Sequence, residues 1–292
     1  MGEAPQKEVW ITAGLPGSGK STVSKQITAN RSYEAFSQDK EAEIARPEML
    51  TWDMHRLGQS IVELNDAAVQ AGRVDFRLEE QARVLIKQAA VHIPHIRQWI
   101  SEQIQYLQDM AVFESPAQHK TTQGVLQFLH RLYHTDNPIQ LIAVGLGEMD
   151  YLMLAVKTIS ERNAVNKTVA SQRDVLFEYH RNNFRDDRAK FQRFFRFEGI
   201  KPCLLLVQNT KEHLQRVLKE RTRATPAHAE IFEEDYVEQI ILQTDPISPD
   251  EGFDKVVVVD NSQRLPIQEI IRRMQGSTTQ QITEEIPFVI SA

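Results

Sequence analysis

A glycine-rich segment near the amino end constrains this chain more than any other feature. Gly14-Leu15-Pro16-Gly17-Ser18-Gly19-Lys20-Ser21 follows the apolar run from Val9 to Ala13 and precedes a helical pattern from Ser21 to Ala29. Glycines here let backbone N–H groups turn inward around a phosphate, because a Cβ would block that approach. The pattern G-x-x-x-x-G-K-[ST] between a strand and a helix is the P-loop signature. It predicts binding of a nucleotide; the alternative is a strand-to-helix turn without a ligand.

Each residue type in this P-loop has an expected role. The start of the following helix adds its positive dipole end to the N–H groups of the loop. Lys20 would place its ammonium group on the β- and γ-phosphates, and the hydroxyl of Ser21 would coordinate Mg²⁺. The predicted nucleotide-binding residues are Gly14, Leu15, Pro16, Gly17, Ser18, Gly19, Lys20, Ser21 and Thr22.

The composition excludes several other classes of protein. The 292 residues are 41% hydrophobic and 25% charged, with a net charge of −6, which disfavours nucleic acid and anionic membranes as partners. No apolar run approaches the roughly 18 to 20 residues of a membrane span, and no signal peptide is visible after the polar start. The expected location is the cytoplasm, with a secreted effector as the alternative. The single cysteine, Cys203, excludes an intrachain disulfide and is expected to pack in the core.

Short apolar runs alternate with helical patterns along most of the chain, which is typical of a parallel sheet covered on both faces. The expected strands are 9–13, 33–37, 110–113, 139–144, 204–207 and 256–259, and the expected later helices are 118–133, 149–162, 169–195, 211–221 and 267–275. The pattern predicts a doubly wound, mostly parallel α/β fold of the P-loop kinase type, with a helical insertion at about 50–106 between the second and third strands. Residues 1–276 would form a single domain, and 277–292 a polar tail.

The class of P-loop protein follows from motifs that are missing. A GTPase needs N-K-x-D after a late strand, whereas Asn209-Thr210-Lys211-Glu212 has an extra residue and no aspartate in register. A motor or AAA-type ATPase usually has an apolar strand that ends in Asp-Glu, whereas the candidate strand before Glu114 ends in a single acid. These differences favour a small kinase.

The order of features from Val9 to Val207 resembles that of the zeta-toxin family of P-loop kinases. The resemblance rests on the P-loop, on an acid about one strand later, on a strand that ends in glutamate, and on two later arginines. It implies transfer of the γ-phosphate of ATP, with Mg²⁺, to a hydroxyl of a nucleotide sugar or a related nucleotide. It also implies a separate antitoxin or inhibitor protein as a partner.

The resemblance assigns the base and the metal ligand. Asp39 falls at the end of the second strand, where the family carries the acid that deprotonates the acceptor hydroxyl; a helix N-cap is the alternative. Glu114 is expected to end the third strand and to bind Mg²⁺ or the acceptor, unless it caps a helix. The family follows this glutamate with Gly-Thr, whereas Ser115-Pro116 follows here, so Ser115 becomes the substrate-binding candidate, with Thr121 and Thr122 as substitutes.

Two arginines are expected to stabilise the transferring phosphoryl group. Arg162 ends a helix that follows a strand, and Arg173 lies shortly downstream, as do the two phosphate arginines of the family. Both could instead be solvated surface residues, and the competing cations are Lys167, Arg181 and Arg185.

Two other functions stay open at this point. One is a P-loop kinase that acts on another metabolite or on a polynucleotide 5′ end. The other is a nucleotide-dependent regulatory ATPase that transfers no phosphoryl group to an acceptor.

Overall fold

The computed structural model of the chain describes residues 6–29, 32–38, 40–41, 70, 76–134, 149–179, 181–224, 236–263, 265–276 and 283–290. The chain forms two compact units. Met1–Gln38 and Ala164–Ala292 make the first, and Asp39–Asn163 makes the second. None of the helices in these ranges combines the length and apolarity that crossing a membrane requires.

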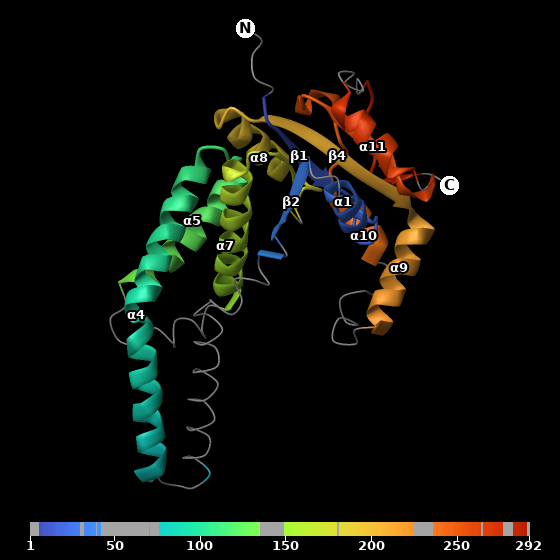
Figure 1. The fold of residues 1–292 in the computed structure, drawn as a ribbon. Coiled ribbons are helices and arrows are strands. Elements are labelled where there is room, and N and C mark those ends of the chain that lie inside the picture. The colour runs from blue at the N-terminus through green and yellow to red at the C-terminus, as the bar shows by residue number, and fades with distance from the viewer. Residues whose placement is uncertain are drawn as a thin grey trace. The chain divides into compact units, whose positions relative to one another are not determined.

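The first unit is built on a parallel sheet (Figure 1). Its strands follow the order β2 (Tyr33–Ser37), β3 (Asp174–Glu178), β1 (Glu8–Ala13), β4 (Lys201–Thr210) and β5 (Val256–Asp260). The short strand β6 (Val289–Ile290) pairs with the end of β4, also in parallel. The predicted doubly wound α/β fold is therefore confirmed, with β1 at the centre of the sheet.

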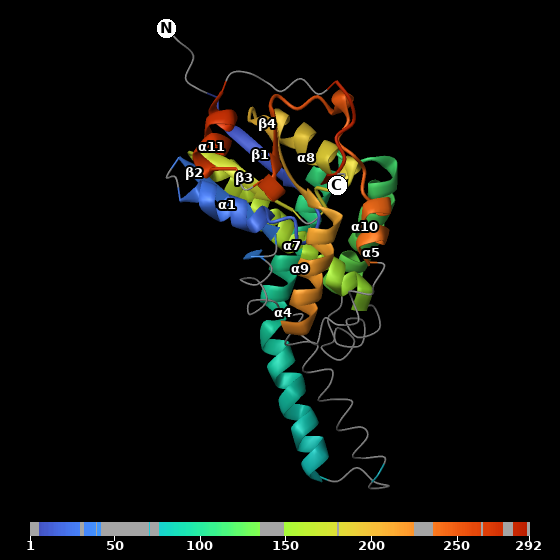
Figure 2. The same cartoon turned by 90° about the vertical axis from the view of Figure 1, so that its right-hand side faces the viewer.

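Helices cover both faces of this sheet (Figure 2). Successive side chains of a strand point to opposite faces. On one face, Trp10 and Leu176 pack with α1 (Lys20–Thr28) and α11 (Ile267–Gln275). On the other face, Phe177 of β3 meets two rings of α8 (Arg185–Phe197), with ring centroids 4.8 Å apart for Phe191 and 5.3 Å for Phe195. Cys203 is fully buried in the first of these cores, as the sequence predicted.

Further short elements follow β4 in the first unit. They are α9 (Lys211–Ala224), α10 (Tyr236–Gln243) and the 3-10 turns η2 (Pro249–Glu251) and η3 (Asn261–Gln263). The second unit holds α4 (Phe76–Ala111), α5 (Pro116–Tyr133) and the first fifteen residues of α7 (Met149–Ala170). Inside this unit the hydroxyl of Tyr106 donates a 3.0 Å hydrogen bond to Glu161, which joins α4 to α7.

Two predicted elements are wrong. Residues 110–113, predicted as the third strand, are the last two residues of α4 and the turn that follows it, because a short apolar run looks the same in a buried helix as in a buried strand. Residues 169–195, predicted as one helix, contain the end of α7, all of β3 and most of α8. The helical insertion still lies between the second and third strands, but its unit spans 39–163 rather than about 50–106. The predicted strand 139–144 lies outside the described residues.

The carboxyl-terminal segment belongs to the fold. Asn209 pairs with Val289 and Thr210 with Ile290, and Ile286 forms a bridge with Ile247. The end of the predicted polar tail is thus hydrogen-bonded to the sheet.

Candidate functional site

The P-loop connects the carboxyl end of β1 to the amino end of α1. Gly17 and Gly19 have φ values of +85° and +97°, a region that side chains with a Cβ rarely adopt. A Cβ at Gly19 would lie 2.3 Å from the amide nitrogen of Asn261, so only glycine fits at this helix N-cap. The result is a bare backbone cradle at a helix N-terminus, where N–H groups and the helix dipole favour an anion.

Three other segments hold this cradle. The side-chain carbonyl of Asn183 accepts a 2.9 Å hydrogen bond from the backbone N–H of Gly14. The side-chain amide of Asn261 donates a 2.8 Å hydrogen bond to the carbonyl of Ser18. A Cβ at Gly17 would lie 3.5 Å from Val217 of α9, so this helix packs directly against the loop. The loop is therefore braced by the segments that follow β3, β4 and β5.

The polar side chains of the P-loop fit a phosphate ligand. The ammonium group of Lys20 donates to the carbonyls of Gly14, at 2.5 Å, and Leu15, at 3.2 Å. A phosphate oxygen can replace these carbonyls, because lysine is a mobile point charge with three donors. Within the described part of the chain, the buried hydroxyl of Ser18 has no hydrogen-bond partner. Ser21 is exposed on the first turn of α1, where its hydroxyl is accessible to a metal ion.

Glu178 places a carboxylate at the same edge of the sheet as the P-loop. It ends β3 and lies opposite Thr12 of β1 and Ser37 of β2. Because Leu176 faces α1, the alternation along the strand places Glu178 on the same face as α1. Glu178 is half-buried and has no hydrogen-bond or ion-pair partner among the described residues. Glu178 and the hydroxyl of Ser21 are the groups near this edge of the sheet that could hold Mg²⁺.

Sequence reasoning missed Glu178 because it treated 169–195 as a helix. The signal is nevertheless in the chain: Val175-Leu176-Phe177 is an apolar run that ends in an acid. Met110–Glu114 fits the same description, but α4 extends to Ala111.

The loop after β3 contains two buried asparagines, Asn182 and Asn183. The amide of Asn182 donates to the carbonyls of Thr12, at 3.1 Å, and Phe177, at 3.2 Å, and so ties β3 to β1 just before the P-loop. Arg188, which is fully buried, donates to the carbonyl of Asn182 at 3.3 Å. Its guanidinium also makes a two-pronged ion pair with Glu251, at 2.7 and 2.6 Å. A buried charge pair thus supports the residues that hold the P-loop.

The structure corrects the role predicted for Arg173. This arginine directly precedes β3, whose first residue, Asp174, pairs with Tyr33 at the start of β2. It therefore lies at the amino edge of the parallel sheet, opposite the edge where the P-loop begins. There it forms a 3.3 Å ion pair with Glu34. A contact with phosphates in the P-loop is incompatible with this location.

Three other predicted site residues lie in the second unit. Glu114 follows α4 instead of ending a strand, and it accepts a 2.7 Å hydrogen bond from the hydroxyl of Thr122. Ser115 is the N-cap of α5 and accepts from the backbone N–H of Gln118. Arg162 lies inside α7 and pairs with Glu102 at 3.0 Å. The strand that was to bring Glu114 beside the P-loop is absent, so the reason for making it a metal ligand is lost. Asp39 lies outside the described residues.

Two of the competing cations already have partners. Arg181 pairs with Asp187 at 2.9 Å, and Arg185 pairs with Asp250 at 2.6 Å, which raises the pKa of the Arg185 guanidinium.

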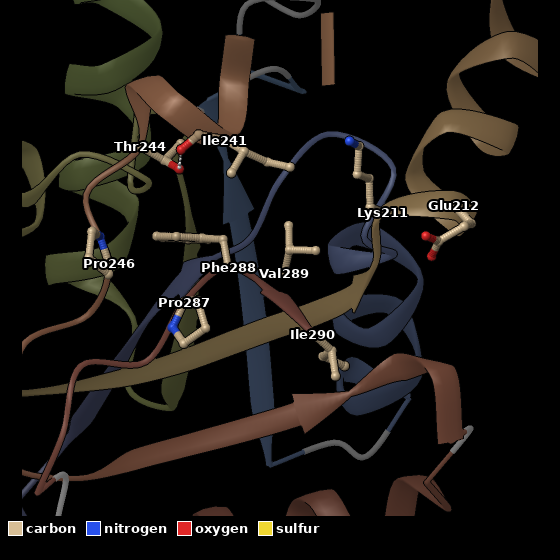
Figure 3. A pocket seen from close by; sticks show the side chains of 9 residues that line it. All are labelled: Lys211, Glu212, Ile241, Thr244, Pro246, Pro287, Phe288, Val289 and Ile290. Atoms are coloured by element: carbon tan, nitrogen blue, oxygen red, sulfur yellow. Dashed lines mark hydrogen bonds between the residues drawn. The ribbon is translucent and has the colours of Figure 1, made fainter. Parts of the chain in front are cut away.

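A pocket of about 430 Å³ opens where β4 runs into α9 (Figure 3). Its apolar lining consists of Ile241, Pro246, Pro287, Phe288, Val289 and Ile290. Lys211, Glu212 and Thr244 supply the polar part of the wall. The hydrogen bond from Lys211 to Glu238 of α10, 2.5 Å long, raises the pKa of the lysine and lowers that of the glutamate.

No protein-family model and no curated protein matches the chain. Among solved structures, the chain is similar to a protein of Chloroflexus aurantiacus described as a "putative kinase". The identity is 12%, the TM-score is 0.44, and the alignment covers 96% of this chain and 100% of the other. A likeness at this level carries no argument about function, which has to come from the geometry of the site.

Proposed function

We propose that the protein is a P-loop phosphotransferase that moves the γ-phosphate of ATP to an alcohol group of a small molecule. The observation that carries this proposal is the place of Glu178. It ends the strand next to β1 and shares the sheet face of the helix that the P-loop opens. A braced phosphate cradle with a carboxylate one strand away has the parts that phosphoryl transfer requires.

Each part of the site has a separate proposed role. The P-loop backbone and Lys20 hold and neutralise the phosphates of ATP. Ser21 and Glu178 would hold Mg²⁺, which would supply positive charge to offset the negative charge of the transition state. The acceptor hydroxyl needs orientation and late removal of its proton, and Asp39, two residues after the end of β2, remains our proposal for that base.

The finer assignment is to a kinase of zeta-toxin type. It is supported by the order of three features along the chain: the P-loop, an acid after the second strand, and a glutamate that ends the third strand. That glutamate is Glu178 rather than Glu114. The acceptor is then a nucleotide sugar or a related nucleotide, and a separate inhibitory protein is the proposed partner. Arg162 stays a proposed phosphate ligand, whereas Arg173 does not.

The test compares Glu178→Gln with a matched control, Glu34→Gln. Glu34 is a carboxylate at the opposite, amino edge of the neighbouring strand. The protein is incubated with ATP, Mg²⁺ and a panel of nucleotides and nucleotide sugars, and phosphorylated products are identified by mass spectrometry. Glu178→Gln should lower turnover about 10²- to 10³-fold with ATP binding retained, whereas Glu34→Gln should not. ATP binding without any phosphorylated product in the wild-type protein would instead favour a regulatory nucleotide-binding protein.

A further inference from the structure

One wall of the pocket between α9 and α10 belongs to the helix that packs against the P-loop. Lys211 begins α9 three residues before Leu214, and a Cβ at Gly17 would lie 3.7 Å from the side chain of Leu214. Three residues of helix span about 4.5 Å, roughly one turn. Figure 3 shows the loop that leads from β1 into α1 passing beside Lys211. A ligand on the P-loop can therefore reach this wall.

The opposite wall is tied to the same loop. Pro246 lines the pocket, and the preceding residue, Asp245, donates its backbone N–H to the carbonyl of Asn183 at 3.1 Å. Asn183 in turn holds Gly14. Both walls are thus anchored on residues that contact the first half of the P-loop.

The direction of the bound nucleotide follows from the strand order. Glu178 lies on β3, on one side of β1, and the pocket lies at the end of β4, on the other side. The proposed transfer places the terminal phosphate toward Glu178. The remainder of the nucleotide then extends away from the acceptor, toward β4.

The lining indicates what kind of group occupies the pocket. Two prolines, a phenylalanine and three branched aliphatic side chains offer little to a phosphate or a sugar hydroxyl. They suit a flat ring of low polarity, and the volume lies within the range of ordinary ligand pockets. The hydroxyl of Thr244 and the carboxylate of Glu212 can accept hydrogen bonds from an amino group on such a ring.

We propose that this pocket binds the nucleobase of the nucleotide whose phosphates lie in the P-loop. This inference rests on the proposed nucleotide-binding function and adds a second, base-binding site to it. It also gives the carboxyl-terminal segment a role, because residues 287–290 form one side of the pocket. This side is fixed in advance: Gln208 donates to the carbonyl of Pro287, and β6 pairs with β4.

The test fills the pocket without touching the P-loop. Ile241→Trp places a bulky ring in the pocket, whereas Leu242→Trp places the same ring at the neighbouring position of α10, which is 85% exposed. Calorimetry measures the affinity of each variant for ATP and for inorganic tripolyphosphate, which carries the phosphates but no base. The wild-type protein should bind ATP at least about tenfold more tightly than tripolyphosphate.

Ile241→Trp should abolish most of that tenfold preference and leave tripolyphosphate affinity within about twofold, while Leu242→Trp should resemble the wild type. The proposal is overturned if Ile241→Trp keeps the preference, or if it weakens both ligands equally. Equal binding of ATP and tripolyphosphate by the wild-type protein also overturns it but leaves the P-loop assignment standing. If the wild-type protein binds neither ligand, the proposed function itself fails.

Discussion

The side chain of Asn183 accepts a 2.9 Å hydrogen bond from the backbone N–H of Gly14, although 169 residues separate the two in sequence. Asn183 is buried, and its neighbour Asn182 joins β3 to β1 through two further hydrogen bonds. The loop that follows Glu178 is therefore coupled to the start of the P-loop. We therefore expect a change at Asn183 to alter the start of the P-loop.

Asn183→Ala should weaken ATP binding in a protein that still folds. Removing the acceptor leaves the N–H of Gly14 without its partner, which costs about 1–3 kcal/mol for a buried group. We expect the unfolding free energy, measured with urea, to fall by about this amount. The affinity for tripolyphosphate, measured by calorimetry, should become several-fold weaker. Unchanged phosphate affinity in the folded variant would contradict the coupling.

Comparing Gly19→Ala with Gly199→Ala should distinguish the loss of the phosphate-binding cradle from the cost of a strained backbone. Both glycines have positive φ, +97° and +73°. A Cβ at Gly19 would meet Asn261 at 2.3 Å, whereas at Gly199 nothing lies within 4 Å. Gly199→Ala should cost only the local strain, about 1–2 kcal/mol of stability, with nucleotide affinity intact. Gly19→Ala should lose most nucleotide binding, measured by titration with ATP. Equal effects on binding would mean that the cradle geometry is irrelevant.

Arg173→Ala should leave phosphoryl transfer unchanged. The arginine is at the amino edge of the sheet and is paired with Glu34, so no phosphate in the P-loop is within its reach. Its side chain is 53% exposed, and exposed ion pairs contribute roughly 0–1 kcal/mol. Turnover of the acceptor and urea denaturation check the two expectations. A loss of turnover of a hundredfold or more, with stability retained, would restore the arginine to the active site.

The part of the site between β1 and α1 could be predicted from the sequence, because the residues that indicate it are neighbours in the chain. Glycines at Gly14, Gly17 and Gly19 report backbone conformation directly, and the apolar runs of β1, β4 and β5 are bounded by turns or long helices. The position of Glu178 depended instead on where α7 ends. The segment between α7 and β3, Ala170-Ser171-Gln172-Arg173, contains no proline or glycine. The sequence therefore does not show where the helix ends and the next apolar run begins. The bracing by Asn183 and Asn261 is a tertiary contact and has no counterpart in local sequence.

Breaking the buried ion pair of Arg188 should lower the free energy of unfolding far more than breaking an exposed ion pair on the same helix. The side chains of Arg188 and Glu251 are 0% and 4% exposed, whereas those of Arg185 and Asp250 are 48% and 67% exposed. Arg188→Ala leaves a buried carboxylate without its partner and should cost about 3–5 kcal/mol. Arg185→Ala should cost roughly 1 kcal/mol or less.

Urea denaturation of the two arginine variants at neutral pH gives both free energies. The double variant Arg188→Ala with Glu251→Ala provides a control for the charge left behind. It should recover part of the loss, because no buried charge then lacks a partner. Similar costs for Arg188→Ala and Arg185→Ala would contradict a structural role for the buried pair.

Alkaline pH should destabilise the protein through Tyr33. Burial, reinforced by the carboxylates of Asp174 and Glu8, raises the pKa of this tyrosine from 10.0 to about 12. Between these two values the folded chain keeps the phenolic proton and the unfolded chain loses it. The folded state then binds more protons, so its stability falls as the pH rises through this window. The contribution is complete below pH 10 and lost above about pH 12.

The measurement is urea denaturation of the wild-type protein and Tyr33→Phe from pH 8 to 11. The variant keeps the ring in the core and has no proton to lose, so its stability should fall less steeply above pH 10. Burial also raises the pKa of Cys203, and that thiol should give both proteins a shared remaining slope. Parallel pH profiles for the two proteins would show that Tyr33 ionises in the folded state as readily as in the unfolded chain, and hence that the start of β2 is open to solvent.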